Sequence, residues 1–523
     1  MFSIPIRQLF CSAFMLFSLI ATIVYVTNID NVKLLSIKIE KTDFVALDER
    51  NNKIRNELNQ TLNNLIKGMP IENDQWCERM ISGDLSINEI KKLKEWKFNE
   101  DNFIVKPPPD EDDMNQRIKR TEAEDKCLNL RKLFYFHNEP LSEEENDYPL
   151  AYAMVTHKSV IQTMTMISSV YQPQNAYCIV VDDQSSNSFL RQVQMLSDCF
   201  KNIFVMNVGK IQWCKYGVVR SVFSCLKYLT EKNHNWKYFQ YMSGVDLPLK
   251  TNLEMVRIFK QLNGTINADV LPFEGYRIRL TQDSIKPPIK LWKSSLSALI
   301  SREAANEMVK SDKVKDLLNY LQYTWCSDES LWATIAGNPT ELNIPGGFDS
   351  ASIYKSLLKE KDRCIKYQTS TLATLEENKD KSITPKSPNF SSKKFKLSSF
   401  YISRYQLWNQ NSYTHPITRS KQQFVKCNGK FVKVSCVFGV EDLPNLINRP
   451  ELVVHKMYMD FEPAAYFCLW KNIRERALNW REQKNFNAEV YSQLPSVRIS
   501  KGDPEDQLKY FFDDICHLSI SGK

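Results

Sequence analysis

AYAMVTHKSVIQTMTMISSVYQPQNAYCIVVDD, residues 151–183, is the stretch that decides the fold of this chain. Its two ends, Ala151–His157 and Ala176–Asp183, are short apolar runs that are typical of buried strands. The segment between them, up to Val170, has the length and apolar spacing of a helix. A strand, a helix and a second strand in this order predict one parallel βαβ unit.

The same alternation continues downstream of this unit. The expected elements are a helix over Ser188–Phe200, a strand over Asn202–Val208, a helix over Val218–Glu231, a strand over Tyr238–Gly244, a strand leading into a loop over Ala268–Leu280, and a strand and helix over Leu291–Asp312 with Ser301 as the N-cap. We therefore predict an α/β fold with an open, mostly parallel sheet that is flanked by helices. Such sheets bind ligands, often nucleotides, beyond the carboxyl ends of their strands.

The 523 residues allow one large catalytic domain with accessory segments. Residues 9–26 carry no charge, which predicts a transmembrane signal anchor after a cytosolic tail of residues 1–8. The alternative is a cleaved signal peptide, whose apolar region is usually shorter. The remaining segments are a luminal stem (27–75), a catalytic domain (76–480) with a flexible insertion at 376–396, and a C-terminal extension (481–523).

Charge and cysteine content limit the class of protein further. The 69 Lys and Arg residues are interleaved with 61 Asp and Glu residues, without the basic stripe that a nucleic-acid partner requires. Of the 13 cysteines, 12 follow the predicted anchor, and this even number suits disulfides in an oxidising compartment. Glycosylation sequons begin at Asn59, Asn263 and Asn389 and agree with a luminal location.

Three acidic positions stand where a substrate or a helix could use them. Asp182, at the end of the second strand, suits a ribose hydroxyl or a uracil edge, or it forms a turn together with Asp183. Asp246, in SGVDLPLKT, orients backbone or substrate, or it caps the helix that starts near Thr251. Glu329, in TWCSDESLWATI, lies in the first turn of a predicted helix, either as a base or as part of its cap, with Ser327 or Asp328 as the N-cap.

The sequence gives no indication of a metal site. Asp110-Glu111-Asp112 is an Asp-x-Asp triplet of the kind that holds a divalent metal, but it precedes the predicted sheet. We therefore predict that no metal cofactor is used and that Lys or Arg side chains neutralise a bound diphosphate.

Several motifs together resemble one family. AYCIVVDD, SGVDLPLKT, CSDESLWATI, KVSCVFGVEDL (Lys433–Leu443) and HKM (His455–Met457) occur in this order. The chain is similar in these segments to the core 2/I-branching β-1,6-N-acetylglucosaminyltransferases and the related peptide O-xylosyltransferases, from about Cys77 to Leu478. The resemblance implies a GT-A-like fold and a metal-independent reaction that inverts the anomeric centre.

The resemblance also implies roles for particular residues. Glu329 matches the catalytic base, and Lys433 and Lys456 match an Arg and a Lys that bind the diphosphate. Lys433 is a departure, because lysine lacks the bidentate fork of arginine. Asp182 matches the nucleotide-side Asp, and His157 and Lys158 match the His-Lys of the first strand. The acceptor candidates rest on location only, and they are Glu274, Arg277, Asp246, Tyr405 and Trp408, of which the last two are expected to stack on a sugar.

Four disulfides follow from the same resemblance. They are Cys77–Cys468, Cys127–Cys199, Cys178–Cys225 and Cys427–Cys436. No pairing is implied for Cys214, Cys326, Cys364 and Cys516. Cys326 is either a free thiol near the site or part of a further bridge.

The expected protein is a single-pass type II Golgi membrane enzyme with a luminal catalytic domain. It transfers N-acetylglucosamine from the donor UDP-GlcNAc in β-1,6 linkage to an O-linked glycan or glycoprotein acceptor. One alternative is transfer of xylose from UDP-xylose to a protein serine. A second is a catalytically silent luminal protein that binds glycans or nucleotide sugars. The lysine at 433, where the family has arginine, favours this alternative, and the presence of Glu329 argues against it.

Overall fold

The computed structural model describes residues 49–71, 75–100, 126–279, 286–356, 358–359, 401–409 and 426–503. The chain divides into two compact units, residues 1–60 and 61–523. The described part of the first unit, residues 49–60, is helical and contains Asn59. The predicted tail, anchor and insertion, the 110–112 triplet and Asn389 lie outside the described residues. In the ranges that the structure describes, no helix has both the length and the apolar character that a membrane span needs.

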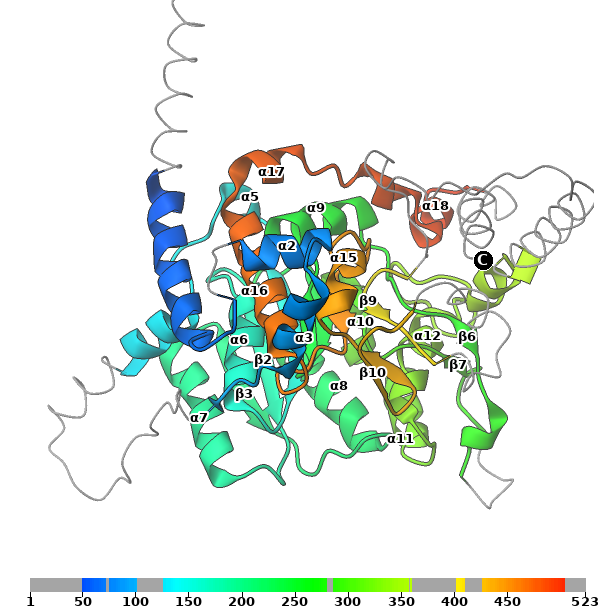
Figure 1. Cartoon of the computed structure of the whole chain (residues 1–523). Coiled ribbons are helices and arrows are strands. Elements are labelled where there is room, and N and C mark those ends of the chain that lie inside the picture. Colours follow the sequence, from blue (N-terminus) through cyan, green and yellow to red (C-terminus); the bar gives the residue numbers. More distant parts are fainter. Residues whose placement is uncertain are drawn as a thin grey trace, which may run out of the picture. The chain divides into compact units, whose positions relative to one another are not determined.

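A five-stranded sheet forms the centre of the second unit (Figure 1). Its strands are β1 (Leu150–Thr156), β2 (Ala176–Val181), β3 (Ile203–Asn207), β4 (Tyr238–Ser243) and β8 (Leu299–Ser301), in the order β3-β2-β1-β4-β8. β1 pairs in parallel with β2 and β4, β2 pairs in parallel with β3, and only β8 runs antiparallel among these five. The prediction of a mostly parallel sheet is confirmed.

Helices cover both faces of this sheet because side chains alternate along each strand. α8 (Tyr216–Glu231) packs on the face formed by Ala151, Ala153 and Cys178, where Val219, Val222 and Cys225 are buried with them. On the other face, the Tyr152 hydroxyl contacts Met255 of α9 (Asn252–Leu262), and the Tyr177 hydroxyl donates to the carbonyl of Val170 at the end of α6 (Val160–Val170). The result is a three-layer α/β domain.

The helices predicted over 188–200, over 218–231 and after Ser301 agree with the structure to within about two residues at their ends. The helix predicted to contain Glu329 in its first turn is wrong, because the α-helix begins only at Trp332 and Glu329 precedes it. The remaining helices are α2 (Trp76–Ser82), α3 (Ile87–Glu95), α5 (Glu143–Asn146), α7 (Asn187–Cys199), α10 (Arg302–Lys310), α11 (Asp312–Leu321), α12 (Trp332–Ala336), α15 (Leu443–Leu446), α16 (Pro463–Leu478), α17 (Trp480–Asn485) and α18 (Pro495–Ser500). Ser301 caps α10 as predicted, since its side chain accepts from the Ala304 amide. Thr251 caps α9 together with Glu254, so the capping alternative for Asp246 is wrong.

Three small sheets lie beyond the central one and carry much of the candidate site. They are β5 (Asp246–Pro248), β12 (Val453–His455) and β9 (Arg404–Gln406), in the order β5-β12-β9; β6 (Leu271–Pro272) with β7 (Trp292–Lys293); and β10 (Lys430–Val432) with β11 (Ser435–Val437). β12 pairs antiparallel with β5 and parallel with β9, which places Asp246 opposite His455 and Gln406 beside it.

The structure contains the four disulfides that the resemblance implies. Cys77–Cys468 joins α2 to α16 across 391 residues, and Cys178–Cys225 joins β2 to α8. A further bridge connects Cys214 with Cys326, which decides between the two alternatives for Cys326. Cys364 and Cys516 lie outside the described residues, and the sequon residue Asn263 is exposed at the end of α9.

Candidate active site

Glu329 lies in a short 3-10 helix, η3 (Ser327–Ser330), which precedes α12. Its backbone amide donates to the carbonyl of Cys326 at 2.9 Å, and its carbonyl accepts from the amide of Ser294 at 2.6 Å, next to β7. Neither η3 nor α12 has a side-chain cap, so the predicted N-cap role of Ser327 or Asp328 is wrong. The turn is therefore held by backbone contacts, and the side chain of Glu329 is available for other partners.

The carboxylate of Glu329 belongs to a network of alternating charges. Arg277 Nη2 donates to Glu329 Oε2 at 2.7 Å, and Arg277 Nε donates to Glu274 Oε2 at 2.6 Å. Lys293 Nζ lies 3.2 Å from Glu274 and 3.8 Å from Glu329. Burial alone would raise the pKa of Glu274, but the Arg277 hydrogen bond and the charge of Lys293 outweigh it and lower this pKa. Glu274 and Arg277, selected by location only, thus converge with the predicted base.

Two backbone segments run side by side to build this network. Glu274 follows β6, and Arg277 ends the 3-10 helix η2 (Gly275–Arg277). The Trp325 amide donates to the Arg277 carbonyl at 2.7 Å, and the Arg279 amide donates to the Tyr323 carbonyl at 3.1 Å. The β6–β7 pair places Lys293 directly opposite Leu271. The acidic and basic side chains are therefore positioned by short backbone pairings.

Asp328, next to the predicted base, has a very different environment. Burial, followed by the negative charge of Glu329, raises the pKa of Asp328 to about 7. Its Oδ1 atom is buried and accepts no hydrogen bond from the described residues. A carboxyl group whose pKa is raised by burial and by a neighbouring charge is a common feature of active sites.

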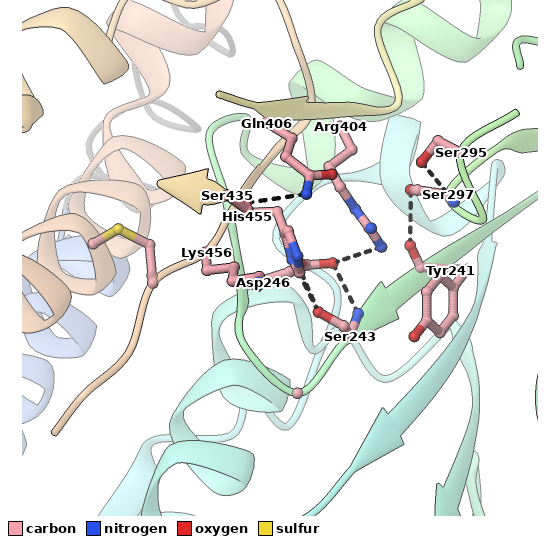
Figure 2. Close-up of polar contacts among 12 residues, drawn as sticks. Tyr241, Ser243, Asp246, Ser295, Ser297, Arg404, Gln406, Ser435, His455 and Lys456 are labelled. Carbon is pink, nitrogen blue, oxygen red and sulfur yellow. Dashed lines mark hydrogen bonds and ion pairs between the residues drawn. The ribbon is translucent and has the colours of Figure 1, made fainter. Parts of the chain in front are cut away.

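A second cluster forms around Asp246, as Figure 2 shows. Asp246 is 0% exposed and accepts hydrogen bonds from the Ser243 amide (2.8 Å) and hydroxyl (2.9 Å). His455 Nδ1 lies 2.6 Å from Asp246 Oδ1, and Arg404 Nη2 lies 3.2 Å from Asp246 Oδ2. Burial would raise the pKa of Asp246, but the charge of Arg404 and the contact with His455 lower it. The prediction that Asp246 contacts an acceptor is wrong, because its carboxylate is fully occupied inside the protein.

Positive charge gathers beside this cluster. Lys456 follows β12 and donates to the carbonyl of Val432 at 3.3 Å. Burial lowers the pKa of Lys456, and the positive charges of Lys433 and Arg404 lower it further. Lys456 thus contacts the residue before Lys433, and two neighbouring lysines of this kind suit an anion such as a diphosphate. Arg404 is a third cation at this place, and the sequence motifs did not identify it.

The ends of β1 and β2 carry the residues assigned to the nucleotide side. His157 and Lys158 directly follow β1 and are exposed. Although His157 is exposed, part of its ring is shielded from water, and this lowers its pKa, as does the charge of Lys158, whereas Asp182 acts in the opposite direction. Asp182 Oδ1 accepts from the amides of Gln184 (3.2 Å) and Ile211 (2.9 Å), so it also forms the turn that the sequence suggested. These three residues meet at one edge of the sheet.

The two aromatic residues that we expected to stack on a sugar do not lie as predicted. Tyr405 is only 9% exposed, its ring stacks on Phe438 at 5.6 Å, and Arg449 covers it at 4.0 Å. The stacking role for Tyr405 is therefore wrong, because its ring is already covered. Trp408 is partly exposed and bridges to Ser435 through its backbone, and its role stays a prediction.

Other aromatic rings are exposed beside Glu329. Tyr276 is 66% exposed and Trp213 is 64% exposed, and Trp325 lies between them. Sequence analysis missed these rings, and the one signal available was that Trp213 and Trp325 each precede a cysteine of the Cys214–Cys326 bridge.

Comparisons with known proteins show which proteins this chain is similar to. Residues 150–395 match the family model described as "Branch: Core-2/I-Branching enzyme". The human beta-1,3-galactosyl-O-glycosyl-glycoprotein beta-1,6-N-acetylglucosaminyltransferase is 27% identical over 420 residues, which cover 77% of this chain and 85% of the relative. The mouse N-acetyllactosaminide beta-1,6-N-acetylglucosaminyl-transferase is 27% identical over 382 residues, which cover 68% and 80%. The human beta-1,3-galactosyl-O-glycosyl-glycoprotein beta-1,6-N-acetylglucosaminyltransferase 3 is 31% identical over 223 residues, which cover 39% and 50%.

Proposed function

Since this chain carries a Core-2/I-Branching enzyme domain and is a glycosyltransferase, we propose that it transfers N-acetylglucosamine from UDP-GlcNAc in β-1,6 linkage to an O-linked glycan. The names of the human and mouse relatives support both the sugar and the linkage. The proposal includes a GT-A-like fold, a Golgi location and a type II membrane anchor at residues 9–26. The uncharged anchor sequence and the five disulfides of the described residues support a luminal catalytic domain.

Glu329 is the catalytic base in this proposal. It takes the proton from the acceptor hydroxyl while that oxygen attacks the anomeric carbon of the donor sugar. The observation that carries the assignment is the 2.7 Å hydrogen bond from Arg277, which orients a carboxylate whose side chain remains 27% exposed. Lys293 Nζ lies 3.8 Å from the same carboxylate, so two cations position it.

Lys433 and Lys456 bind the diphosphate of the donor, without a metal ion. The charges of Lys433 and of Arg404 both act on Lys456, whereas the carboxylate of Asp246 is already paired with Arg404 and His455. As the leaving group departs, negative charge develops on the diphosphate, and fixed cations stabilise it. His157, Lys158 and Asp182 hold the nucleoside end at the edge formed by β1 and β2. Activity in excess EDTA is the expected result, and a strict requirement for Mn²⁺ would refute metal independence.

Replacing Glu329 tests the central claim. The Glu329→Gln variant should lose roughly 10²–10⁴-fold in kcat, the range for a general base, with unchanged affinity for UDP. The exposed Glu341→Gln variant is the matched control and should keep full activity. Turnover of Glu329→Gln at the wild-type rate would remove Glu329 from the mechanism.

The choice of donor and acceptor needs a separate assay. The full-length protein is incubated with a panel of UDP-sugars, a core 1 O-glycan and a serine-containing peptide, in EDTA. Transfer of N-acetylglucosamine to the glycan supports the proposal, and linkage analysis then decides on β-1,6. Transfer of xylose to the peptide would replace the proposed reaction.

A further inference from the structure

Two distant segments of the second unit meet at the Cys214–Cys326 disulfide, although 112 residues separate them in sequence. The amide of Cys326 also donates to the carbonyl of Cys214 at 3.1 Å. Both cysteines have left-handed backbones, with φ of 58° and 48°, a conformation that is uncommon for residues other than glycine. The covalent bond and the hydrogen bond together fix the segment before α8 against the turn that carries Glu329.

Each of these cysteines follows a tryptophan, so the bridge brings two large rings together. The rings of Trp213 and Trp325 lie 6.5 Å apart at an interplanar angle of 86°, and the ring of Tyr276 lies 6.2 Å from Trp325. We name Trp213, Trp325 and Tyr276 the aromatic wall. Because Trp213 and Tyr276 are mostly exposed, the wall leaves a large apolar area in contact with water. Such an area on a folded protein marks a binding surface.

The aromatic wall is continuous with the proposed active site at both of its ends. At one end, the guanidinium of Arg277, which binds Glu329, lies 5.8 Å from the Tyr276 ring and 5.9 Å from the Trp325 ring. At the other end, Lys433 Nζ lies 4.3 Å over the ring of Trp213. The wall therefore lies between a residue that contacts Glu329 and a residue assigned to the donor diphosphate.

The chemistry around the wall indicates what it binds. Apolar ring faces lie beside charged groups, namely Glu274, Arg277 and Arg279, the last of which lies 5.7 Å from the Trp325 ring. A pyranose presents one face of C–H groups and a rim of hydroxyls, and it matches both components at once.

We propose that the aromatic wall is an acceptor subsite, which packs against a pyranose one or two units away from the sugar that reacts at Glu329. The Cys214–Cys326 disulfide is a positioning element in this proposal, because it fixes the wall relative to the base. The inference rests on the proposed function and adds to it that the enzyme discriminates acceptors by their length.

Tyr276 allows a clean test, because its ring and its hydroxyl can be removed separately. The hydroxyl donates to Glu274 at 2.9 Å, and the Tyr276→Phe variant removes this bond but keeps the ring. The Tyr276→Ala variant removes both. We expect Tyr276→Ala to raise KM for a trisaccharide acceptor about tenfold, from the loss of one aromatic contact, with little change for a monosaccharide glycoside. Tyr276→Phe should resemble wild type, and KM for UDP-GlcNAc should not change in either variant.

Two results would overturn the subsite. They are an unchanged trisaccharide KM in Tyr276→Ala, or an equal rise for the monosaccharide glycoside. Wild-type protein that turns over no acceptor would instead contradict the proposed function. In that case, titration of the trisaccharide into wild type and Tyr276→Ala decides the binding claim on its own: equal affinities would overturn it.

The disulfide is tested with a matched pair of double variants. Cys214→Ala/Cys326→Ala should lower kcat/KM for the trisaccharide at least tenfold and for the monosaccharide less. Cys127→Ala/Cys199→Ala, which removes a bridge that ends at α7, should keep wild-type kinetics even if its melting temperature falls. Equal kinetic losses in the two variants would reduce the bridge to a general structural role. If the first variant does not fold, the Tyr276 pair still decides the subsite.

Discussion

Replacing Asp328 by asparagine is expected to stabilise the protein near neutral pH but not in acid. Burial and the charge of Glu329 raise the pKa of Asp328 to about 7, whereas an aspartate in an unfolded chain titrates near 3.9. Between these values the folded protein binds more protons than the unfolded chain, so stability falls as the pH rises. The contribution of Asp328 to the free energy of unfolding is therefore fully present below about pH 4 and is lost by about pH 7.

The size of the effect follows from the difference between these two pKa values. About three pKa units correspond to about 4 kcal/mol at 1.36 kcal/mol per unit. The Oδ1 atom is buried, but the residue as a whole is partly exposed, and screening by solvent reduces the effect. We therefore expect Asp328→Asn to exceed wild type in free energy of unfolding by about 2 kcal/mol at pH 7.5, relative to the difference at pH 4.

Urea unfolding of the full-length protein between pH 4 and pH 8 measures this difference directly. The exposed Asp316→Asn variant on α11 controls for the substitution of a carboxylate by an amide. The reasoning fails if the difference between Asp328→Asn and wild type does not change with pH, or if it grows in the opposite direction.

Three further predictions concern Lys456, Lys433 and His455. Lys456→Ala should weaken the binding of UDP by roughly 10- to 100-fold and that of free uridine hardly at all, measured by calorimetric titration of both ligands. Equal losses of affinity for the two ligands would show that Lys456 does not contact the diphosphate. Lys433→Arg should tighten the binding of UDP about fivefold, because arginine restores a bidentate contact with phosphate. Lys430→Arg on β10 is the control and should leave the affinity for UDP unchanged. A Lys433→Arg variant that binds UDP as wild type does would exclude a phosphate contact at Lys433. Burial lowers the pKa of His455 to about 4. As the pH falls from about 6.5 to about 4, the free energy of unfolding of wild type should therefore fall by about 3 kcal/mol relative to that of His455→Gln. Urea unfolding measures both proteins, and a difference that does not change with pH would contradict the prediction.

The central sheet could be predicted from sequence because its parallel strands are short apolar runs that helices separate along the chain. The strands β1 to β4 lie within about two residues of their expected ranges. Periodicity fails for β5, β9 and β12, which have three residues each, too few to show an alternation. Their pairing brings Arg404 next to Asp246 from 158 residues away, and no local pattern indicates such a contact.

Sequence motifs selected residues that the structure brings together, whereas selection by residue type alone failed where burial decides what a side chain can contact. Glu329 was identified from its neighbours in sequence, and Arg277 joined it through space. Tyr405 was expected to face a sugar, but the sheet that contains it turns its ring onto Phe438. An aromatic side chain looks the same in a sequence whether it is covered or exposed, and only tertiary packing separates the two cases.

The catalytically silent alternative depended on Lys433, and the surrounding charges argue against it. Lysine at this position keeps the positive charge, and Lys456 and Arg404 add two more cations around one buried carboxylate, Asp246. Burying a lysine beside other cations costs stability: burial lowers the pKa of Lys456, and the charges of Lys433 and Arg404 lower it further. Nucleotide binding alone would explain why the protein keeps these cations together. It would not explain why Asp328, whose pKa is raised by burial, lies beside the carboxylate of Glu329 that Arg277 binds. A base and a leaving-group site account for both clusters together, because proton removal and diphosphate departure occur in the same transfer.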